Sequence, residues 1–253
     1  MVTGVSSGIG FGIAKKLAES GCNIIGCGLR PEDAKGAKQF IAEVQSYNRR
    51  AWYRSVDVRN KRELKDFVDD GVSKFGHIDL LVSNAGENIF KGAGDCSEKD
   101  WQNNIDLNLS AHWRLSKLCY PYLKTSPNGC IIIMSSNHAF HTINGCFPYN
   151  VTKSALSGLV QSLAIEWGPD VRAVGIAPGF IDTKGNESWF ASFPDPEAER
   201  QRTVELHPAG KIGSVEEIGA YCAFIASDYA SFTTGTTFLI DGGRSAIMQD
   251  TQE

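Results

Sequence analysis

The chain contains 253 residues, and its 25 Lys and Arg against 29 Asp and Glu give a formal net charge of −4 at pH 7. At roughly 100–200 residues per domain, this length fits one large domain or two small ones. Hydrophobic residues make up 42% and charged residues 21%, which is typical of a globular protein and excludes extensive disorder. The mildly acidic balance excludes a general attraction to nucleic acid or to an anionic membrane surface.

The sequence gives no sign of a membrane span or of an oxidising compartment. Its longest aliphatic run covers only residues 131–134, whereas a membrane span needs about 20 apolar residues. We expect no secretory signal, because the first residues lack a basic region followed by an apolar core. The 7 cysteines are odd in number and form no CxxC pair, which predicts reduced thiols, no bound metal and a cytoplasmic location.

Short β-rich segments alternate with helical patterns along the chain. In chain order we predict a strand at residues 2–3, a helix at 8–20, a strand at 23–27, a helix at 31–47, a strand at 52–56, a helix at 61–75, a strand at 79–83, a helix at 101–123, a strand at 130–135, a helix at 148–167, a strand at 171–177, a helix at 215–226 and a strand at 236–240. Residues 184–213 are interpreted as an irregular insertion that forms a substrate lid. The alternation predicts an α/β fold, a doubly wound parallel sheet of Rossmann type in three layers, formed by a single domain over residues 1–253.

The first predicted strand is unusually short. Only Met1, Val2 and Thr3 precede the glycine-rich turn, although a central strand should contain about five residues. We therefore expect that part of this strand lies upstream of the given sequence, and that its loss affects stability more than chemistry.

Residues 3–10 have the form TGxxxGxG and lie between the first predicted strand and the first predicted helix. Gly4, Gly8 and Gly10 permit a tight turn and let a pyrophosphate approach the main chain. The partial positive charge at the helix N-terminus favours the same anion. A purely structural turn is the alternative, but the position between strand and helix indicates a dinucleotide site.

Tyr149 and Lys153 are four residues apart and share one face of a predicted helix. An ammonium beside a phenol favours the phenolate, so Lys153 is predicted to lower the pKa of Tyr149. Such a tyrosine can donate a proton to a carbonyl or accept one from an alcohol. Ser136 follows a buried strand, where its hydroxyl either holds the substrate oxygen or caps a turn.

These segments together resemble the short-chain dehydrogenase/reductase family in its single-domain form. The resemblance covers nearly the whole chain and rests on motifs in the family's order, namely TGxxxGxG at residues 3–10, Asp57 with Val58, the NAG motif Asn84, Ala85 and Gly86, then Asn108, Ser136, Tyr149 and Lys153, the PG motif at residues 178–183, and DGG at residues 241–243.

The resemblance implies a role for each catalytic position. Tyr149 would be the general acid/base, Lys153 would lower its pKa and bind the nicotinamide ribose, and Ser136 would polarise the substrate. Asn108 would bend its helix and hold a water in the proton relay. Cofactor binding is assigned by resemblance to Gly4, Ser6, Ser7, Gly8, Ile9, Gly10, Asp57, Val58, Asn84, Ala85, Gly86, Tyr149, Lys153, Pro178, Gly179, Ile181 and Thr183.

The choice of dinucleotide depends on the end of the second predicted strand. An NAD enzyme usually carries an acid there that binds the ribose diol, but this sequence has Gly28, followed by Leu29 and Arg30. Arg30 could pair with a 2′-phosphate, which favours NADP over NAD. The alternative is a solvated loop charge, because Arg30 lies one position later than usual and Ser7 replaces a basic residue common in NADP enzymes.

Polar residues next to Ser136 indicate the kind of substrate. Residues 135–138, 84–87 and 194–197 look similar to bacterial glucose- and polyol-oxidising members of the family. A polar pocket suits a hydroxylated substrate, so we expect substrate contacts from Ser136, His138, Tyr149 and Trp189. The aromatic residues of the lid, Trp189 included, could equally pack the lid itself.

The sequence thus predicts an NAD(P)-dependent oxidoreductase that interconverts a secondary alcohol, preferably a sugar or polyol, and a ketone or lactone by hydride transfer. The alternatives are a 3-oxoacyl thioester reductase and, in another class, a non-catalytic dinucleotide sensor or scaffold. By resemblance we expect a homo-oligomer, a dimer or a homotetramer, with a small-molecule substrate and with neither nucleic acid nor membrane as a partner.

Overall fold

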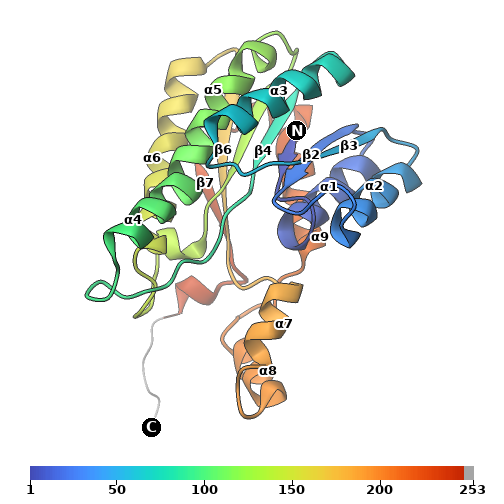
Figure 1. Cartoon of the computed structure of the whole chain (residues 1–253). Helices are drawn as coiled ribbons and strands as arrows, with labels where there is room; N and C mark the ends of the chain where they lie inside the picture. Colours follow the sequence, from blue (N-terminus) through green and yellow to red (C-terminus); the bar gives the residue numbers. More distant parts are fainter. Residues whose placement is uncertain (248–253) are drawn as a thin grey trace.

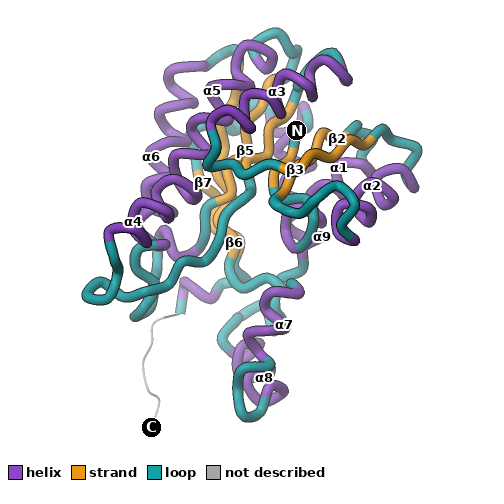
Figure 2. Tube along the Cα trace, viewed as in Figure 1, coloured by secondary structure: helices purple, strands orange, loops and turns teal. Residues whose placement is uncertain are grey.

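The computed structural model describes residues 1–247, which form a seven-stranded parallel sheet covered by helices on both faces (Figures 1 and 2). The strand order is β3-β2-β1-β4-β5-β6-β7, and every pairing is parallel. The strands are β1 (Val2–Thr3), β2 (Ile24–Gly28), β3 (Ala51–Ser55), β4 (Leu80–Ser83), β5 (Gly129–Met134), β6 (Val171–Pro178) and β7 (Thr237–Ile240). The predicted doubly wound α/β fold is confirmed.

Two helical layers cover the sheet and create two hydrophobic cores (Figure 1). One core joins the sheet to the helices on one face and contains Phe67, Leu115 and Leu156; the other contains Ile13 and Phe40. The helices are α1 (Gly8–Glu19), α2 (Lys35–Ser46), α3 (Lys61–Phe75), α4 (Glu98–Ile105), α5 (Ala111–Leu123), α6 (Tyr149–Trp167), α7 (Lys184–Phe190), α8 (Pro196–Glu205) and α9 (Val215–Ala226), with short turns η1 (Asp106–Ser110), η2 (Asn137–Ala139), η3 (Asp228–Ala230) and η4 (Arg244–Ala246).

The strand order reverses direction at β1, which lies between β2 and β4. In open α/β sheets, the crevice outside the carboxyl ends of the strands at such a reversal is where ligands bind. The fold therefore brings the loops after β1, β2, β4, β5 and β6 to one edge of the sheet.

The first strand consists of Val2–Thr3. The amino group of Met1 donates a hydrogen bond to the Leu80 carbonyl at 2.6 Å, next to the start of β4.

The helix predicted at residues 31–47 begins later than expected, at Lys35. Residues 31–34 form a turn instead, because this segment is bonded to the neighbouring strand. The Tyr53 hydroxyl donates to the Arg30 carbonyl at 2.8 Å, and the Glu32 carboxylate accepts from the Ser55 N–H at 2.8 Å.

The interpretation of residues 184–213 as irregular is wrong, since α7 and α8 lie within this segment and project from the sheet edge (Figure 1). Each helix has a side-chain cap: Thr183 accepts from the Asn186 N–H, and Asp195 accepts from the Ala198 N–H. Such caps satisfy N–H groups that a short helix otherwise leaves free. No helix formed by residues 1–247 is long and apolar enough to cross a membrane.

Candidate active site

The glycine-rich turn after β1 requires glycine for two separate reasons. Gly4 and Gly8 have φ values of 75° and 57°, in the left-handed region that favours glycine. Gly10 is needed for space, because a Cβ at this position would lie 2.3 Å from the carbonyl oxygen of Gly4. The predicted tight turn is therefore present, and α1 begins inside it.

The N-terminus of α1 offers free donors to an anion. Ser7 is the N-cap, but its side chain makes no capping hydrogen bond, and the first turn contains no acidic residue. The first N–H groups of a helix have no partner within the helix, and a pyrophosphate can accept from them. The turn therefore fits the diphosphate of a dinucleotide.

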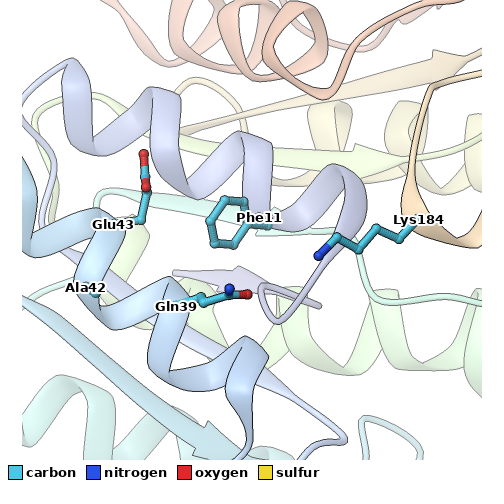
Figure 3. A pocket seen from close by; sticks show the side chains of 5 residues that line it. All are labelled: Phe11, Gln39, Ala42, Glu43 and Lys184. Atoms are coloured by element: carbon cyan, nitrogen blue, oxygen red, sulfur yellow. The ribbon is translucent and has the colours of Figure 1, made fainter.

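A cation lies next to this turn. Phe11 of α1 and Lys184 of α7 line an open groove of about 470 Å³ with Gln39, Ala42 and Glu43 of α2. Figure 3 shows the Lys184 amino group directed toward the first turn of α1. Lys184 is not among the residues predicted from the sequence, because a lysine after the PG motif has no distinctive spacing.

Thr3 connects the glycine turn to the NAG motif after β4. Its Oγ1 accepts from the N–H groups of Asn84 and Ala85 at 2.9 and 2.8 Å, and its carbonyl accepts from Asn84 Nδ2 at 2.8 Å. A single threonine thus fixes the distance between the two loops that the resemblance assigns to the cofactor.

The segment after β6 closes over the same turn. The Thr183 Cγ2 lies 3.7 Å from the place where a Cβ of Gly8 would be. Ile181 is buried, and its carbonyl accepts from Asn186 Nδ2 at 2.6 Å. Gly179 donates to the Ile240 carbonyl at 2.9 Å, which places the predicted PG motif between the turn and β7.

Asp57 and Val58 follow β3 at the same edge, as predicted. The Asp57 carboxylate is paired with Arg59, with Nη2 to Oδ2 at 2.7 Å. This pairing holds the pKa of Asp57 below its ordinary value. Val58 is buried.

The end of β2 leaves little room for a side chain at position 28. A Cβ on Gly28 would lie 3.1 Å from both the Ser6 Oγ and the Tyr53 hydroxyl. Arg30 is exposed beyond this point, and within residues 1–247 its guanidinium takes part in no hydrogen bond or ion pair with a protein side chain.

The predicted catalytic side chains lie where β5 ends and where α6 begins. Ser136 follows β5 and is buried; its Oγ accepts from the His138 N–H at 3.2 Å. Tyr149 is the first residue of α6 and is also buried. One turn later, the Lys153 Nζ lies 5.5 Å from the centroid of the Tyr149 ring.

The pKa of Tyr149 differs from the sequence prediction. Burial raises it to about 12, and hydrogen bonding with Ser136 opposes this rise only in part. Burial also lowers the pKa of Lys153 to about 7. The predicted lowering fails because the Lys153 Nζ donates to the Met134 carbonyl, at 2.9 Å, and because the phenol is desolvated.

Asn108 lies in η1, a π-helical turn between α4 and α5. The irregularity agrees with the bend that the resemblance implies, and π turns are frequent at functional sites. Its Nδ2 donates to the Glu87 carbonyl at 2.9 Å and to the Asn104 Oδ1 at 2.8 Å. A Cβ on Gly86 would lie 2.7 Å from the Asn108 Oδ1 and 3.6 Å from the Lys153 Nζ. Asn108, Gly86 and Lys153 are thus close neighbours.

Two of the predicted substrate residues, His138 and Trp189, have different aromatic neighbours. The His138 ring lies 6.1 Å from the Tyr149 ring between centroids, and Phe90 packs edge-on against both. Trp189 instead packs against aromatic rings of its own segment, Phe180, Phe190 and Phe193. The predicted contact between Trp189 and the substrate stays a prediction.

Two buried polar residues near the site were missed. Asn104 lies four residues before Asn108, and this helical spacing was the available signal. His112 is fully buried, with Nδ1 2.8 Å from the Ser83 Oγ. Burial, followed by the nearby Lys153, lowers the pKa of His112 to about 3, so its ring is neutral. No group of three or more His, Cys, Asp or Glu side chains gathers in a metal-binding arrangement within residues 1–247.

Comparisons with known proteins agree with this geometry. A family model described as enoyl-(acyl carrier protein) reductase matches residues 4–245. The chain is 31% identical over 245 residues to dehydrogenase/reductase SDR family member 4 of Homo sapiens, covering 96% of this chain and 86% of that protein. It is 32% identical over 245 residues to 3beta-hydroxysteroid dehydrogenase 1 of Eggerthella lenta, covering 96% and 92%.

Among solved structures, the fold is similar to the ligand-free aldohexose dehydrogenase of Thermoplasma acidophilum, with a TM-score of 0.87 and 30% identity over 100% of this chain and 95% of that one. The family model and the relatives span nearly the whole chain, and both relatives are named as dehydrogenases or reductases. The chain is therefore an oxidoreductase that belongs to the short-chain dehydrogenase/reductase family.

Proposed function

We propose that the protein is an NAD(P)-dependent oxidoreductase that interconverts a secondary alcohol, in particular a sugar or polyol, and the corresponding ketone or lactone. One observation carries this proposal: Ser136, Tyr149 and Lys153 meet at the sheet edge that also holds the uncapped N-terminus of α1. A proton donor and an anion site therefore share one crevice.

Tyr149, Ser136 and Lys153 have different roles in the proposed proton transfer. A dinucleotide bound over the glycine turn would supply the hydride acceptor or donor. In the reductive direction the Tyr149 phenol donates its proton to the carbonyl oxygen and becomes a phenolate, and in the oxidative direction the Tyr149 phenolate accepts the proton of the substrate hydroxyl. Ser136, whose side chain lowers the pKa of Tyr149 and is therefore close to its phenol, holds the substrate oxygen. Lys153, with a pKa near neutrality, carries the charge that phenolate formation requires.

The groups around Tyr149 favour a hydroxylated substrate. The Ser136 Oγ lies 3.3 Å from the Asn137 Oδ1, and His138 lies beside the Tyr149 ring. Substrate hydroxyls need such paired donors and acceptors, and sites built from them discriminate strongly. The similar Thermoplasma acidophilum protein is an aldohexose dehydrogenase, which agrees with the same class.

A substrate panel tests this function. Purified protein is incubated with aldoses, polyols, simple secondary alcohols and 3-oxoacyl thioesters, each with NADP and with NAD, and reduced nicotinamide is followed by absorbance. We expect turnover with one or more sugars or polyols. Turnover confined to 3-oxoacyl thioesters would favour the thioester reductase, and dinucleotide binding without any turnover would favour a sensor.

We infer a preference for NADP over NAD. Ser6 and Tyr53 crowd the position where a ribose-binding acid would replace Gly28, and the Arg30 guanidinium is exposed nearby. Arg30→Ala is expected to weaken NADPH binding roughly tenfold, through loss of one charge-assisted contact, and to leave NADH binding unchanged. Fluorescence titration measures both, with the exposed Arg62→Ala of α3 as the control. Equal loss for both dinucleotides would contradict this role of Arg30.

We infer further that the chain forms a homo-oligomer, a dimer or a tetramer. The free edge of β7 carries the half-exposed Phe238, and α9 exposes Tyr221 and Phe224. An exposed sheet edge with apolar side chains is suited to pairing with another copy. A cytoplasmic location is proposed because all seven cysteines are free.

A further inference from the structure

Asn104 occupies the centre of a buried polar network between α4 and α6. Its side chain has no exposure to solvent. The Nδ2 donates to the Pro148 carbonyl at 2.9 Å and to the Thr152 Oγ1 at 3.3 Å, and the Oδ1 accepts from the Asn108 Nδ2 at 2.8 Å. Both donor hydrogens and the carbonyl oxygen of one amide therefore have partners.

These partners belong to the two helices that carry the proton-transfer residues. Asn108 lies in the π-helical turn after α4, whereas Pro148 caps α6 and directly precedes Tyr149. A second contact joins the same elements, since Trp101 of α4 stacks on Phe147 with ring centroids 5.6 Å apart. Asn104 is the polar part of this connection, and its partner Pro148 lies 44 residues later in the sequence.

The amide suits this place better than an apolar side chain would. The Asn108 Nδ2 and the Pro148 carbonyl face the fully buried Asn104 amide, and an unpartnered buried polar group costs roughly 1–3 kcal/mol. A satisfied buried network is also rigid, because its bonds strengthen one another at low local dielectric. Asn104 thus fixes where α6 starts relative to Asn108.

We propose that Asn104 is a positioning residue that holds the start of α6, and with it Tyr149, in register with Asn108 and Ser136. The proposal rests on the acid/base role proposed for Tyr149. Asn104 touches neither substrate nor cofactor; it acts through Pro148 and Asn108. A small displacement of a reacting group can cost roughly a hundredfold in rate, so a fixed register has a direct kinetic consequence.

The test compares Asn104→Asp and Asn104→Leu with a matched control. Asp has the same shape but loses the amide donors, and it keeps the test informative if the Leu variant does not fold. The control is Asn128→Leu, because the Asn128 amide also makes several hydrogen bonds, to Ala226, Asp228 and Arg172, but lies before β5 at the opposite edge of the sheet.

Two readouts separate positioning from simple loss of stability. The first is kcat with the substrate that the panel identifies, which is expected to fall roughly 10- to 100-fold with little change in dinucleotide affinity. The second needs no substrate: the pKa of Tyr149, followed by NMR of ¹³Cζ-labelled tyrosine and assigned with Tyr149→Phe. Loosening of the α6 start admits water, so this pKa should fall from about 12 toward 10.0.

The proposal is overturned if folded Asn104 variants keep both kcat and the Tyr149 pKa, or if Asn128→Leu reduces kcat as much as they do. A lower kcat and a lower Tyr149 pKa in the Asn104 variants alone would support it. If the panel yields no turnover at all, the proposed function fails, while the titration still decides whether Asn104 positions Tyr149.

Discussion

Replacement of Tyr149 by Phe is expected to reduce turnover by at least roughly a hundredfold, and up to ten-thousandfold, because general acid/base catalysis contributes factors of this size. The phenol hydroxyl is the group that exchanges a proton with the substrate oxygen, and the remaining ring keeps its edge-on contacts with Phe90 and His138. The variant should therefore fold normally and bind the dinucleotide with unchanged affinity. Steady-state kinetics and fluorescence titration measure the two quantities.

Tyr120→Phe is the matched control for this experiment. Tyr120 lies in α5 and stacks on Trp167 with ring centroids 4.3 Å apart, away from the carboxyl edge of the sheet. Its hydroxyl should be dispensable for turnover. Wild-type rates in Tyr149→Phe would remove the basis of the proposed mechanism, and an inactive wild type that binds dinucleotide would indicate a sensor.

Lys153→Met is expected to abolish turnover and at the same time to stabilise the folded protein near neutral pH. The pKa of Lys153 is about 7 in the folded protein, whereas the ordinary pKa of a lysine, which the unfolded chain retains, is 10.5. Between these values the unfolded chain binds more protons than the folded one, so the stability of the wild type rises with pH in this window. The cost of burying the ammonium is complete below pH 7 and disappears toward 10.5.

Methionine carries no proton, so the stability of the variant does not follow this dependence. The full shift from 10.5 to about 7 sets an upper limit of about 5 kcal/mol on the advantage of Lys153→Met at low pH. Denaturant unfolding of both proteins from about pH 6 to about pH 9 should show this advantage shrinking as pH rises. A difference that is independent of pH, or that grows with pH, would contradict the lowered pKa.

Most of the fold could be predicted because its helices and strands carry strong local patterns. The helix predicted at residues 61–75 has the same limits in the structure, with an apolar face that includes Leu64 and Phe67. Helices α7 and α8 lack such a pattern. Helix α8 buries polar residues, Glu199 and Thr203, and its stability depends on the Asp195 cap and on tertiary contacts that spacing does not reveal.

The sequence predicted the positions of the motif residues in the candidate site, but not their pKa values or their buried partners. Short spacings placed Tyr149, Lys153 and Asn108 correctly at one edge of the sheet, because the order of strands and helices fixes where each loop emerges. The pKa of Tyr149 was predicted in the wrong direction, since burial depends on the whole packed structure. The contact of Asn104 with Pro148 could not be predicted, because the two residues are distant in the sequence.

The crowded end of β2 has a consequence for protein engineering. In NAD enzymes of this fold, a carboxylate at the end of this strand binds the ribose diol. Here the Cβ of an aspartate in place of Gly28 would lie 3.1 Å from both the Ser6 Oγ and the Tyr53 hydroxyl, so these two side chains would have to shift to accept it. Smaller side chains at those two positions would relieve the crowding, so a carboxylate at this strand end is best designed together with its neighbours.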